Sequence, residues 1–287
     1  MKHPQSQTYQ QKLIFIHIPK AAGTTFRDVL EREYEPEQTF VIRDNEFRES
    51  LQDFNNLPRQ RQVEIKLLVG HMPFGAHKFL TDPAAYITLM REPVDRIISH
   101  YYYVRRNPGH KLYHQVTSCK MDLIDYVCSG ISRELDNGQT RLISGMNSVS
   151  IGECSEKMLN QAIDNIHTHF VVIGLVERFD ETLILMRHKL GWSTYPFYTR
   201  RNTASSRKLR QEFPETTVKT IERYNQLDCE LYDYVRRNFD EQIETLPFFR
   251  KMELQAFHRL NQFYQKSTCI KPMLGSARKK VKKAMPF

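Results

Sequence analysis

The sequence predicts an α/β protein with three layers, in which helices cover both faces of a central, mainly parallel sheet. Two observations predict this class. Short apolar runs alternate along the chain with amphipathic segments, which is the order of parallel strands joined by crossover helices. The 287 residues are 40% hydrophobic and 26% charged, an ordinary globular composition that excludes a disordered, collagen-like or coiled-coil chain.

Four short apolar runs are expected to be buried strands, because they are rich in β-branched or aromatic residues and end at turn signals. Residues 35–62 are polar with aromatic anchors, and we expect a mixed connection with a short helix there. The expected strands cover residues 12–18, 65–70, 85–90 and 170–176.

Helices are expected where apolar residues recur at the spacing of one helix face. Pro93 suits the first position of one helix, Ser155 can cap another, and Gly191 can close a third. The expected helices cover residues 26–34, 93–106, two short stretches within 121–145, 155–170, 178–192 and 215–239, with a last helix ending at about residue 264.

The net charge of +9 comes largely from the C-terminal end. Residues 264–287 contain seven Lys or Arg and no acid, and removing their +7 leaves +2 for the rest of the chain. The balanced body argues against a nucleic-acid partner, whereas the basic end is either solvated or in weak contact with anionic membrane. We expect a disordered N-terminus at 1–11, one domain at 12–264 and a basic tail at 265–287.

Residues 1–11 lack the apolar core of a signal peptide, and the longest apolar run, 171–176, is far shorter than the ~20 residues that a membrane helix needs. The five cysteines form no CxxC pair and are too scattered for a zinc cluster. We therefore expect a cytoplasmic protein with reduced thiols and no metal.

A candidate anion site follows the first expected strand, where residues 19–25 read PKAAGTT. The unpaired N–H groups and the dipole of a helix N-terminus attract anions. Lys20 adds an ammonium, Gly23 allows close backbone approach, and two threonine hydroxyls can bind an anion. A plain turn with a surface lysine is the alternative. The segment departs from GxxxxGK[ST], which weakens an ATPase or kinase interpretation.

Residues 15–26, FIHIPKAAGTTF, resemble the 5′-phosphosulfate loop of the sulfotransferases that use 3′-phosphoadenylyl sulfate (PAPS). The resemblance is closest to the heparan sulfate 2-O- and 6-O-sulfotransferases and their bacterial relatives, which typically read HIPKTGGTT. Ala21 and Ala22 replace Thr and Gly, and Ala22 cannot freely take positive φ. The resemblance implies a P-loop-like fold. It also implies that Lys20 and the loop hold the 5′-phosphosulfate, with contacts from Ala22, Gly23, Thr24, Thr25 and Phe26.

Residues 88–103, TLMREPVDRIISHYYY, resemble the family's 3′-phosphate segment. The resemblance implies that Arg91 and Ser99 grip the 3′-phosphate and so distinguish PAPS from ATP, a role that suits an arginine fork. Ser99 lies almost two turns into the helix, so Arg91 must return along the helix face. Residues 198–207 resemble a basic loop that closes over the nucleotide, which implies Arg200 and Arg201; a solvated loop is the alternative.

His71 follows the strand at 65–70, where open α/β sheets bind ligands. The family carries a GH segment here, which implies that His71 takes the acceptor proton while Lys20 stabilises the leaving phosphate. A histidine that caps the strand is the alternative. His77 is expected at the acceptor or on the surface. Residues 136–145 resemble a cleft-lining segment, which implies contacts from Asn137, Gln139 and Arg141; a turn and helix start are the alternative.

The resemblance covers roughly residues 12–240. It implies a PAPS-dependent sulfotransferase that moves a sulfuryl group to a hydroxyl of a carbohydrate-type acceptor by in-line displacement, without metal. Two other functions stay open: a small-molecule kinase of the P-loop type, and a non-catalytic protein of the same fold that binds a nucleotide or polyanion. The two motifs at strand ends carry this functional prediction.

Overall fold

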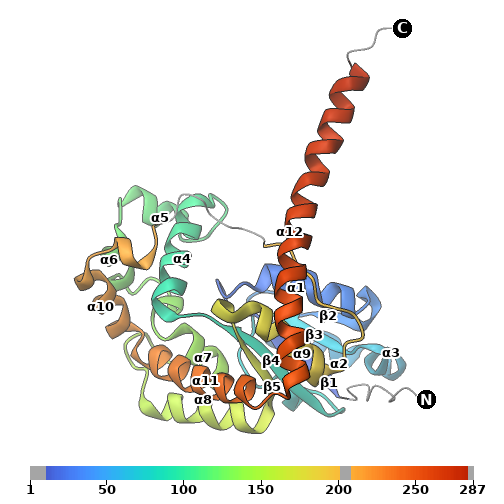
Figure 1. Ribbon diagram of the computed structural model, residues 1–287. Coiled ribbons are helices and arrows are strands. Elements are labelled where there is room, and N and C mark those ends of the chain that lie inside the picture. Colours follow the sequence, from blue (N-terminus) through green and yellow to red (C-terminus); the bar gives the residue numbers. More distant parts are fainter. Residues whose placement is uncertain (1–10, 201–207, 284–287) are drawn as a thin grey trace.

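Five parallel strands form the centre of the molecule. The computed structural model describes residues 11–200 and 208–283, with side chains as far as 267. The strand order is β2-β3-β1-β4-β5, and all neighbouring pairs are parallel (Figure 1). Helices surround this sheet, so the predicted α/β class is confirmed. The strands are β1 (Lys12–Ile16), β2 (Thr39–Val41), β3 (Leu67–Gly70), β4 (Ala84–Met90) and β5 (Phe170–Leu175).

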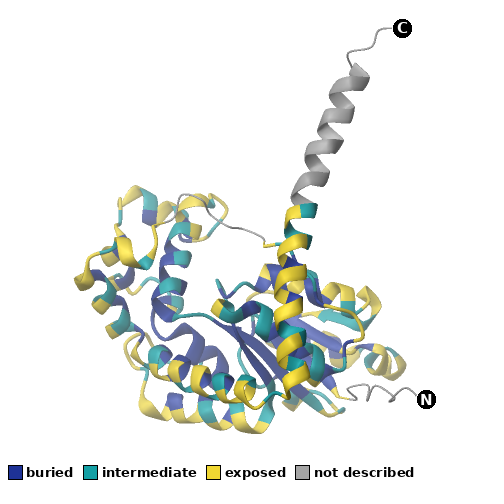
Figure 2. Ribbon diagram, viewed as in Figure 1, coloured by how far each residue is buried: buried dark blue, intermediate teal, exposed yellow. Residues whose placement is uncertain are grey.

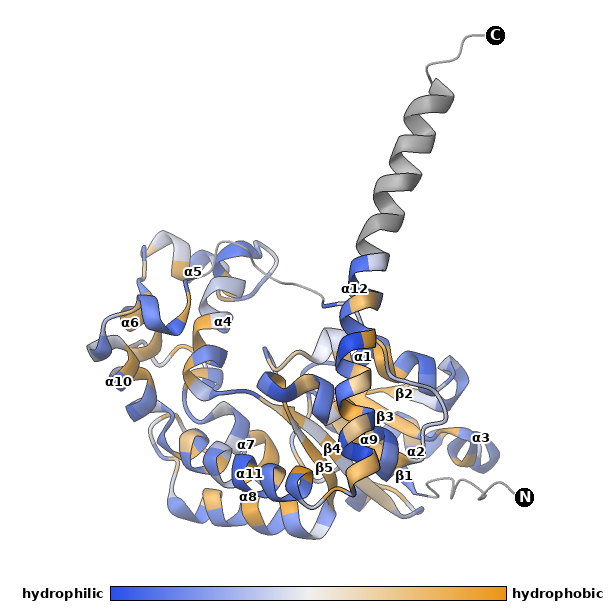
Figure 3. Ribbon diagram, viewed as in Figure 1, coloured by the Kyte–Doolittle hydropathy of each residue, from blue (hydrophilic) through white to orange (hydrophobic). Residues whose placement is uncertain are grey.

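The central strands are buried on both faces, as their continuous apolar runs predict. All of β1 and β3 is buried, and only the first residue of β4 is partly exposed (Figures 2 and 3). Strand β2 was not predicted, because it has only three residues and none of them is buried. It lies at the edge of the sheet, where a strand needs no apolar run.

The longer helices begin near the predicted signals. Pro93 is the first residue of its helix, Ser155 is an N-cap residue, and Gly191 ends a helix in the left-handed region at φ 70°. The α-helices are α1 (Gly23–Glu33), α2 (Phe47–Asn56), α3 (Arg59–Glu64), α4 (Pro93–Arg106), α5 (Tyr113–Ser118), α6 (Leu123–Cys128), α7 (Gly138–Ser144), α8 (Glu156–His169), α9 (Phe179–Leu190), α10 (Glu215–Tyr224), α11 (Gln226–Glu244) and α12 (Phe248–Lys283).

Two helix predictions were wrong. The helix expected at 215–239 is broken into α10 and α11 at Asn225, whose side chain accepts a hydrogen bond from Asn137 N and donates to Leu135 O. This tertiary pairing overrides local helix propensity. The last helix, α12, continues to Lys283 instead of ending near residue 264, so it runs into the predicted basic tail. The predicted disorder of 1–11 falls almost entirely outside the described residues.

The core has two parts. The larger one fills the space around the sheet, and the smaller one lies between α4, α6 and α10 around Ile97, Ile98 and Tyr126. The second part fixes α4 beside the end of β4, and this matters because α4 forms one wall of the cleft described next. Among the described residues, no helix is both long and apolar enough to cross a membrane.

Candidate active site

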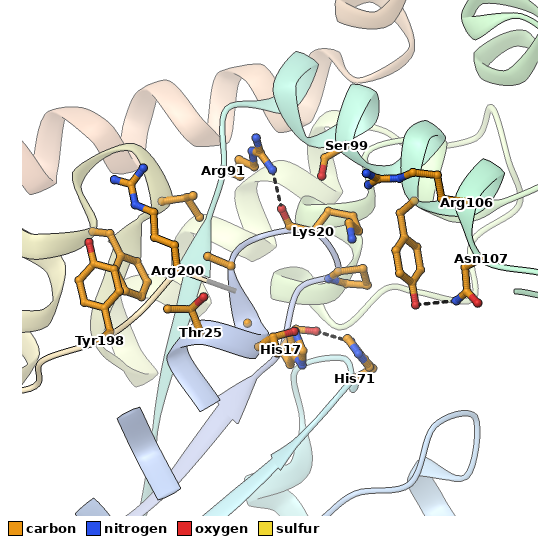
Figure 4. Close-up of a pocket in the computed structure, with 17 residues that line it drawn as sticks. His17, Lys20, Thr25, His71, Arg91, Ser99, Arg106, Asn107, Tyr198 and Arg200 are labelled. Carbon is orange, nitrogen blue, oxygen red and sulfur yellow. Dashed lines mark hydrogen bonds between the residues drawn. The ribbon is translucent and has the colours of Figure 1, made fainter. Parts of the chain in front are cut away.

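A cleft of about 760 Å³ lies beyond the carboxyl end of β1, between the neighbouring ends of β3 and β4 (Figure 4). Strands β3 and β2 lie on one side of β1, and strands β4 and β5 lie on the other side. The strand order therefore reverses at β1, which is the position where open α/β sheets bind ligands. Among the described residues that line it are four cations and no carboxylate: Lys20, Arg91, Arg106 and Arg200. The cleft therefore favours a polyanionic ligand.

The loop between β1 and α1 forms the floor of the cleft and has an unusual backbone. Lys20 and Ala22 both lie in the left-handed region, at φ 68° and 56°. Such backbone strain is common at ligand sites. Gly23 is required by packing, since a Cβ there would lie 1.7 Å from His17 Nε2. Ala22, Gly23, Thr24 and Thr25 all line the cleft.

Phe26 does not line the cleft, which corrects the prediction for this residue. Its side chain is fully buried and packs edge-on against Phe15. Its backbone N–H donates to Ala22 O at 3.1 Å, which is the first hydrogen bond of α1. The N–H group of Phe26 is therefore occupied by a hydrogen bond within the helix. The N–H groups of residues 23–25 lie before this first helical hydrogen bond.

Arg91 and Ser99 both line the cleft (Figure 4), and their joint grip on a 3′-phosphate stays a prediction. The Arg91 guanidinium donates through Nη1 to Lys20 O at 3.1 Å, which ties the two motifs together. The Lys20 ammonium lies 3.8 Å from the centre of the Tyr103 ring, a cation–π contact. The loop lysine and the α4 helix therefore face each other across the cleft.

The backbone carbonyl of His17, just after β1, holds His71 in one tautomer. Its Nδ1 lies 2.7 Å from His17 O, and because a carbonyl only accepts, Nδ1 carries the proton. In the neutral ring, Nε2 is then the unprotonated nitrogen and is able to take a proton. His71 lines the cleft and also stacks on the His17 ring, with 4.0 Å between centroids.

His17, which was not among the predicted site residues, also lines the cleft. Burial, aided by His71, Arg27 and Lys20, lowers its pKa to about 3. The ring is therefore neutral at pH 7 and adds no positive charge beside His71.

The α4 wall contains two cleft residues that were missed. Arg106 and Asn107 line it together with Tyr103. Asn107 Nδ2 donates to the Tyr103 hydroxyl at 3.1 Å and orients the ring. Ser99, Tyr103 and Arg106 are spaced at i, i+4 and i+7, so the helix face that carries Ser99 was the available signal.

The opposite wall consists of Val176, Phe179, Tyr198 and Arg200. Tyr198 is held from behind by α12, because its backbone N–H donates to Asn261 Oδ1 at 3.0 Å. Its hydroxyl donates to Asp180 Oδ1 at 2.8 Å, and the other Asp180 oxygen contacts His258. Arg200 lies at the cleft, whereas Arg201 lies outside the described residues.

Gln139 is fully buried and does not line the cleft, which corrects its predicted ligand contact. Its side-chain amide instead forms hydrogen bonds with both the N–H and the C=O group of Arg91. Arg91 N donates to Gln139 Oε1 at 3.0 Å, and Gln139 Nε2 donates to Arg91 O at 2.9 Å. Gln139 is therefore a positioning residue for Arg91.

Asn137 and Arg141 are also buried and away from the cleft, so their predicted ligand contacts are corrected too. Asn137 Oδ1 accepts from Leu227 N at 2.9 Å and caps the start of α11. Arg141 Nε donates to Asp136 O at 2.7 Å, and its Nη1 donates to Val149 O at 2.6 Å. Both side chains use their polar atoms on the protein itself.

His77 is likewise absent from the residues that line the cleft. Its Nδ1 lies 2.8 Å from the Tyr86 hydroxyl, and its ring packs against His169 with 4.5 Å between centroids. Burial, with His169 and Lys78, lowers the pKa of His77. The structure gives it packing contacts away from the lining of this cleft, and its acceptor contact stays a prediction.

Comparison with known proteins identifies the family. Residues 2–273 match the model of the galactose-3-O-sulfotransferase family. The chain belongs to this family. Membership confirms the predicted sulfotransferase relationship, and it rests on a match over nearly the whole chain.

The relatives of this galactose-3-O-sulfotransferase family member include a Drosophila melanogaster heparin sulfate O-sulfotransferase, 24% identical over 83% of this chain and 76% of that protein. A human heparan-sulfate 6-O-sulfotransferase 2 is 23% identical over 88% of this chain and 48% of that protein. The chain thus spans about half the length of the human relative. Mouse sulfotransferase SULT7A1, solved with PAP, aligns over 83% of this chain and 90% of that chain with 11% identity and a TM-score of 0.33, too weak a likeness to support the fold or a ligand.

Proposed function

We propose that the chain transfers a sulfuryl group from PAPS to a hydroxyl of a carbohydrate acceptor. The main support for this proposal is the cleft at the N-terminus of α1. The described residues that line it include four cations and no carboxylate, and the chain belongs to a sulfotransferase family. PAPS carries a phosphosulfate and a separate 3′-phosphate, and the cleft offers cations near both of its motifs. The names of the family and of the relatives, which refer to galactose and heparan sulfate, support a carbohydrate acceptor.

The residues of the cleft fit this co-substrate. The N-terminus of α1, with Thr24 and Thr25, would hold the 5′-phosphosulfate, while Arg91 and Ser99 would hold the 3′-phosphate. PAPS, when bound, supplies the activated sulfuryl group and a phosphate leaving group. Lys20 would stabilise the negative charge that develops on the leaving phosphate, which is how positioned cations lower such barriers.

His71 would act as the general base through Nε2. The hydrogen bond from Nδ1 to His17 O holds the ring in the required tautomer. When Nε2 takes the acceptor proton, the positive charge that forms is stabilised by the same carbonyl. The acceptor hydroxyl must then lie within about 3 Å of Nε2. Tyr103 and Asn107 line the cleft too, and we propose that this aromatic and amide wall contacts the sugar.

The alternatives are weaker. The relatives reported above are named as sulfotransferases, which gives the kinase interpretation no support. A non-catalytic protein of the same fold would bind the nucleotide without turnover and is an outcome of the test below. A metal-free reaction, a cytoplasmic location, no nucleic-acid partner and weak contact of the basic tail with anionic membrane stay part of the proposal, motivated by the charge distribution and motifs of the sequence.

A thermal-shift experiment tests the co-substrate. The unfolding temperature is measured with the product 3′,5′-adenosine bisphosphate (PAP), AMP, ADP and ATP with magnesium. A ligand that binds only the folded state at about 100 times its Kd adds ~2.7 kcal/mol, which is roughly 4 °C for a chain of this length. Arg91→Ala should remove the PAP shift. Arg105→Ala is the matched control, since Arg105 is the same residue type on α4 but does not line the cleft. A shift with ATP and magnesium alone would refute the proposal.

An activity measurement separates binding from catalysis. Transfer of labelled sulfate from PAPS is measured with galactose-containing and heparan-type acceptors, for the wild type and for His71→Ala. The variant should keep the PAP thermal shift and lose about 10²–10⁴-fold in turnover. Equal turnover in both proteins would exclude His71 as the base. A PAP shift without turnover on any acceptor class would favour the non-catalytic protein.

A further inference from the structure

Helix α12 has one face on the body of the molecule. Phe257 and Asn261 are buried on that face, 0% and 1% exposed, and α12 packs along α9 (Figure 1). These residues fix the orientation of the helix between Phe248 and Tyr264. The side chains on its other faces are therefore presented to solvent by a rigid support.

The solvent side of α12 presents several large apolar side chains among polar and basic ones. The five most exposed large hydrophobic side chains in the described part of the protein are all on this helix (Figures 2 and 3). The least exposed of them is Leu260 at 54%, and the most exposed is Phe248 at 78%. The five are Phe248, Phe249, Met252, Leu260 and Phe263.

Four of these side chains and Ala256 form one stripe, which we call the α12 stripe. Its members Phe249, Met252, Ala256, Leu260 and Phe263 follow one another at steps of three or four residues, so they lie on one helix face. At 1.5 Å per residue the stripe is about 21 Å long. Scattered exposed apolar residues are ordinary, but a continuous stripe of this length marks a contact surface.

The charges next to the stripe indicate what it contacts. From residue 254 to the C-terminus the sequence has eight Lys or Arg and no Asp or Glu. Arg259 flanks the stripe, because it precedes Leu260 directly and follows Ala256 by three residues. A second copy of the helix would need acidic partners for its basic residues, as paired helices commonly have, and would otherwise bring like charges together. Glu253 is the one acid between Phe249 and Phe263, and it already pairs with Arg187 and Arg250 of its own chain.

We infer that the α12 stripe docks this protein on the surface of an anionic lipid bilayer. A helix with Phe and Leu on one face and basic residues beside them lies in the plane of the membrane interface. Basic residues alone give weak, salt-sensitive attachment, and an apolar contact is the second signal that stable attachment needs. The inference does not rest on the proposed reaction, because it uses neither the cleft nor PAPS.

The test is vesicle flotation of the full chain without nucleotide. Vesicles of phosphatidylcholine alone are compared with vesicles containing about 30% phosphatidylserine, a composition with a negative surface potential. We expect binding to the anionic vesicles only. Phe249→Ser with Phe263→Ser should weaken it roughly tenfold or more, because two large apolar contacts are lost. The matched control is Gln255→Ser with Gln262→Ser, two exposed residues of the same helix outside the stripe.

Each outcome decides the inference. All four positions are exposed, so both double variants should unfold at the wild-type temperature, which is checked first. Loss of binding in the stripe variant alone supports the inference. Equal binding of both variants, equal binding to neutral vesicles, or no binding at all would overturn it. A wild-type dimer in light scattering that becomes a monomer in the stripe variant would also overturn it, in favour of a second copy of the chain.

Discussion

Replacing Ala22 by glycine is expected to stabilise the protein, because the present residue has an unfavourable backbone conformation. Ala22 is the residue before α1 and has φ 56° and ψ 17°, in the left-handed region. The heparan sulfate sulfotransferase pattern HIPKTGGTT, which this loop resembles, has glycine at this position. The structure therefore keeps the loop conformation that suits glycine while the sequence supplies alanine.

The size of the effect follows from two opposing terms. An L-residue in the left-handed region costs about 1–2 kcal/mol. Glycine avoids this cost in the folded protein. It also has more conformational freedom in the unfolded chain, and this lowers the free energy of unfolding by roughly 0.5–1 kcal/mol. The net gain for Ala22→Gly is about 0.5–1 kcal/mol. With an unfolding entropy of about 2.1 cal/mol/K per residue, the unfolding temperature should rise by about 1–2 °C.

Ala21→Gly is the matched control, since it makes the same chemical change one residue earlier. Ala21 is 1% exposed and is not among the described residues with positive φ. Its change to glycine removes a buried methyl group and adds unfolded-state freedom, so about 1–2 kcal/mol of stability should be lost. The two neighbouring substitutions are therefore expected to have opposite signs.

The measurement is the free energy of unfolding in urea without nucleotide, with circular dichroism as the readout. The unfolding temperature gives a second estimate, and PAP titration shows whether the loop still binds. If Ala22→Gly destabilises the protein as much as Ala21→Gly does, the left-handed conformation of Ala22 is refuted. The account of the loop as a strained site would then fail with it.

Three further predictions concern the residues behind the cleft. Gln139→Leu removes the partners of the Arg91 N–H and C=O groups, so the free energy of unfolding should fall by about 1–3 kcal/mol. PAP binding, measured by calorimetry, should weaken roughly tenfold. An unchanged PAP affinity would contradict the positioning role of Gln139. The pKa of His17 is about 3 in the folded protein, below its ordinary 6.5, so its contribution to stability is complete above pH 6.5 and is lost as the pH falls toward 3. In urea unfolding the advantage of the wild type over His17→Gln should shrink by about 2 kcal/mol between pH 7 and pH 5, and parallel curves would contradict the shift. Asn261→Leu should weaken PAP binding through the cleft wall it holds, whereas Gln255→Leu, at an exposed position of the same helix, should not; equal affinities would show that α12 does not shape the cleft.

The sheet was predictable because its central strands are buried on both faces. Such strands read as continuous apolar runs, and those of β1, β3, β4 and β5 were found within two residues of their ends. The edge strand β2 has no such run, and the break at Asn225 depends on partners that are distant in sequence. Local sequence patterns therefore predicted the strands that are buried in the core. They missed the exposed edge strand and the helix break, which depend on contacts between residues distant in sequence.

The site was predictable where its residues lie in one short segment at a strand end. Lys20, Arg91 and His71 each follow a strand, and parallel strands bring such positions to one edge. Tyr198 is held at the cleft by Asn261 of α12 and Asp180 of α9, and no local sequence pattern predicts those contacts. Gln139 was misplaced for a different reason: a buried polar residue and a cleft residue look alike in sequence.

The buried polar network behind Arg91 explains how the cleft keeps its shape without apolar packing at that point. Asp228 is fully buried and accepts hydrogen bonds from Gln139 N at 3.2 Å and from Thr140 N at 2.7 Å, which fixes the start of α7. Arg96, also fully buried, lies 3.5 Å from the same carboxylate. A buried carboxylate without such donors costs several kcal/mol, so α7 has little freedom to move. Because Gln139 on α7 brackets the Arg91 peptide, this rigidity is passed to the guanidinium in the cleft, and removing the Asp228 carboxylate should disturb nucleotide binding although no ligand touches it.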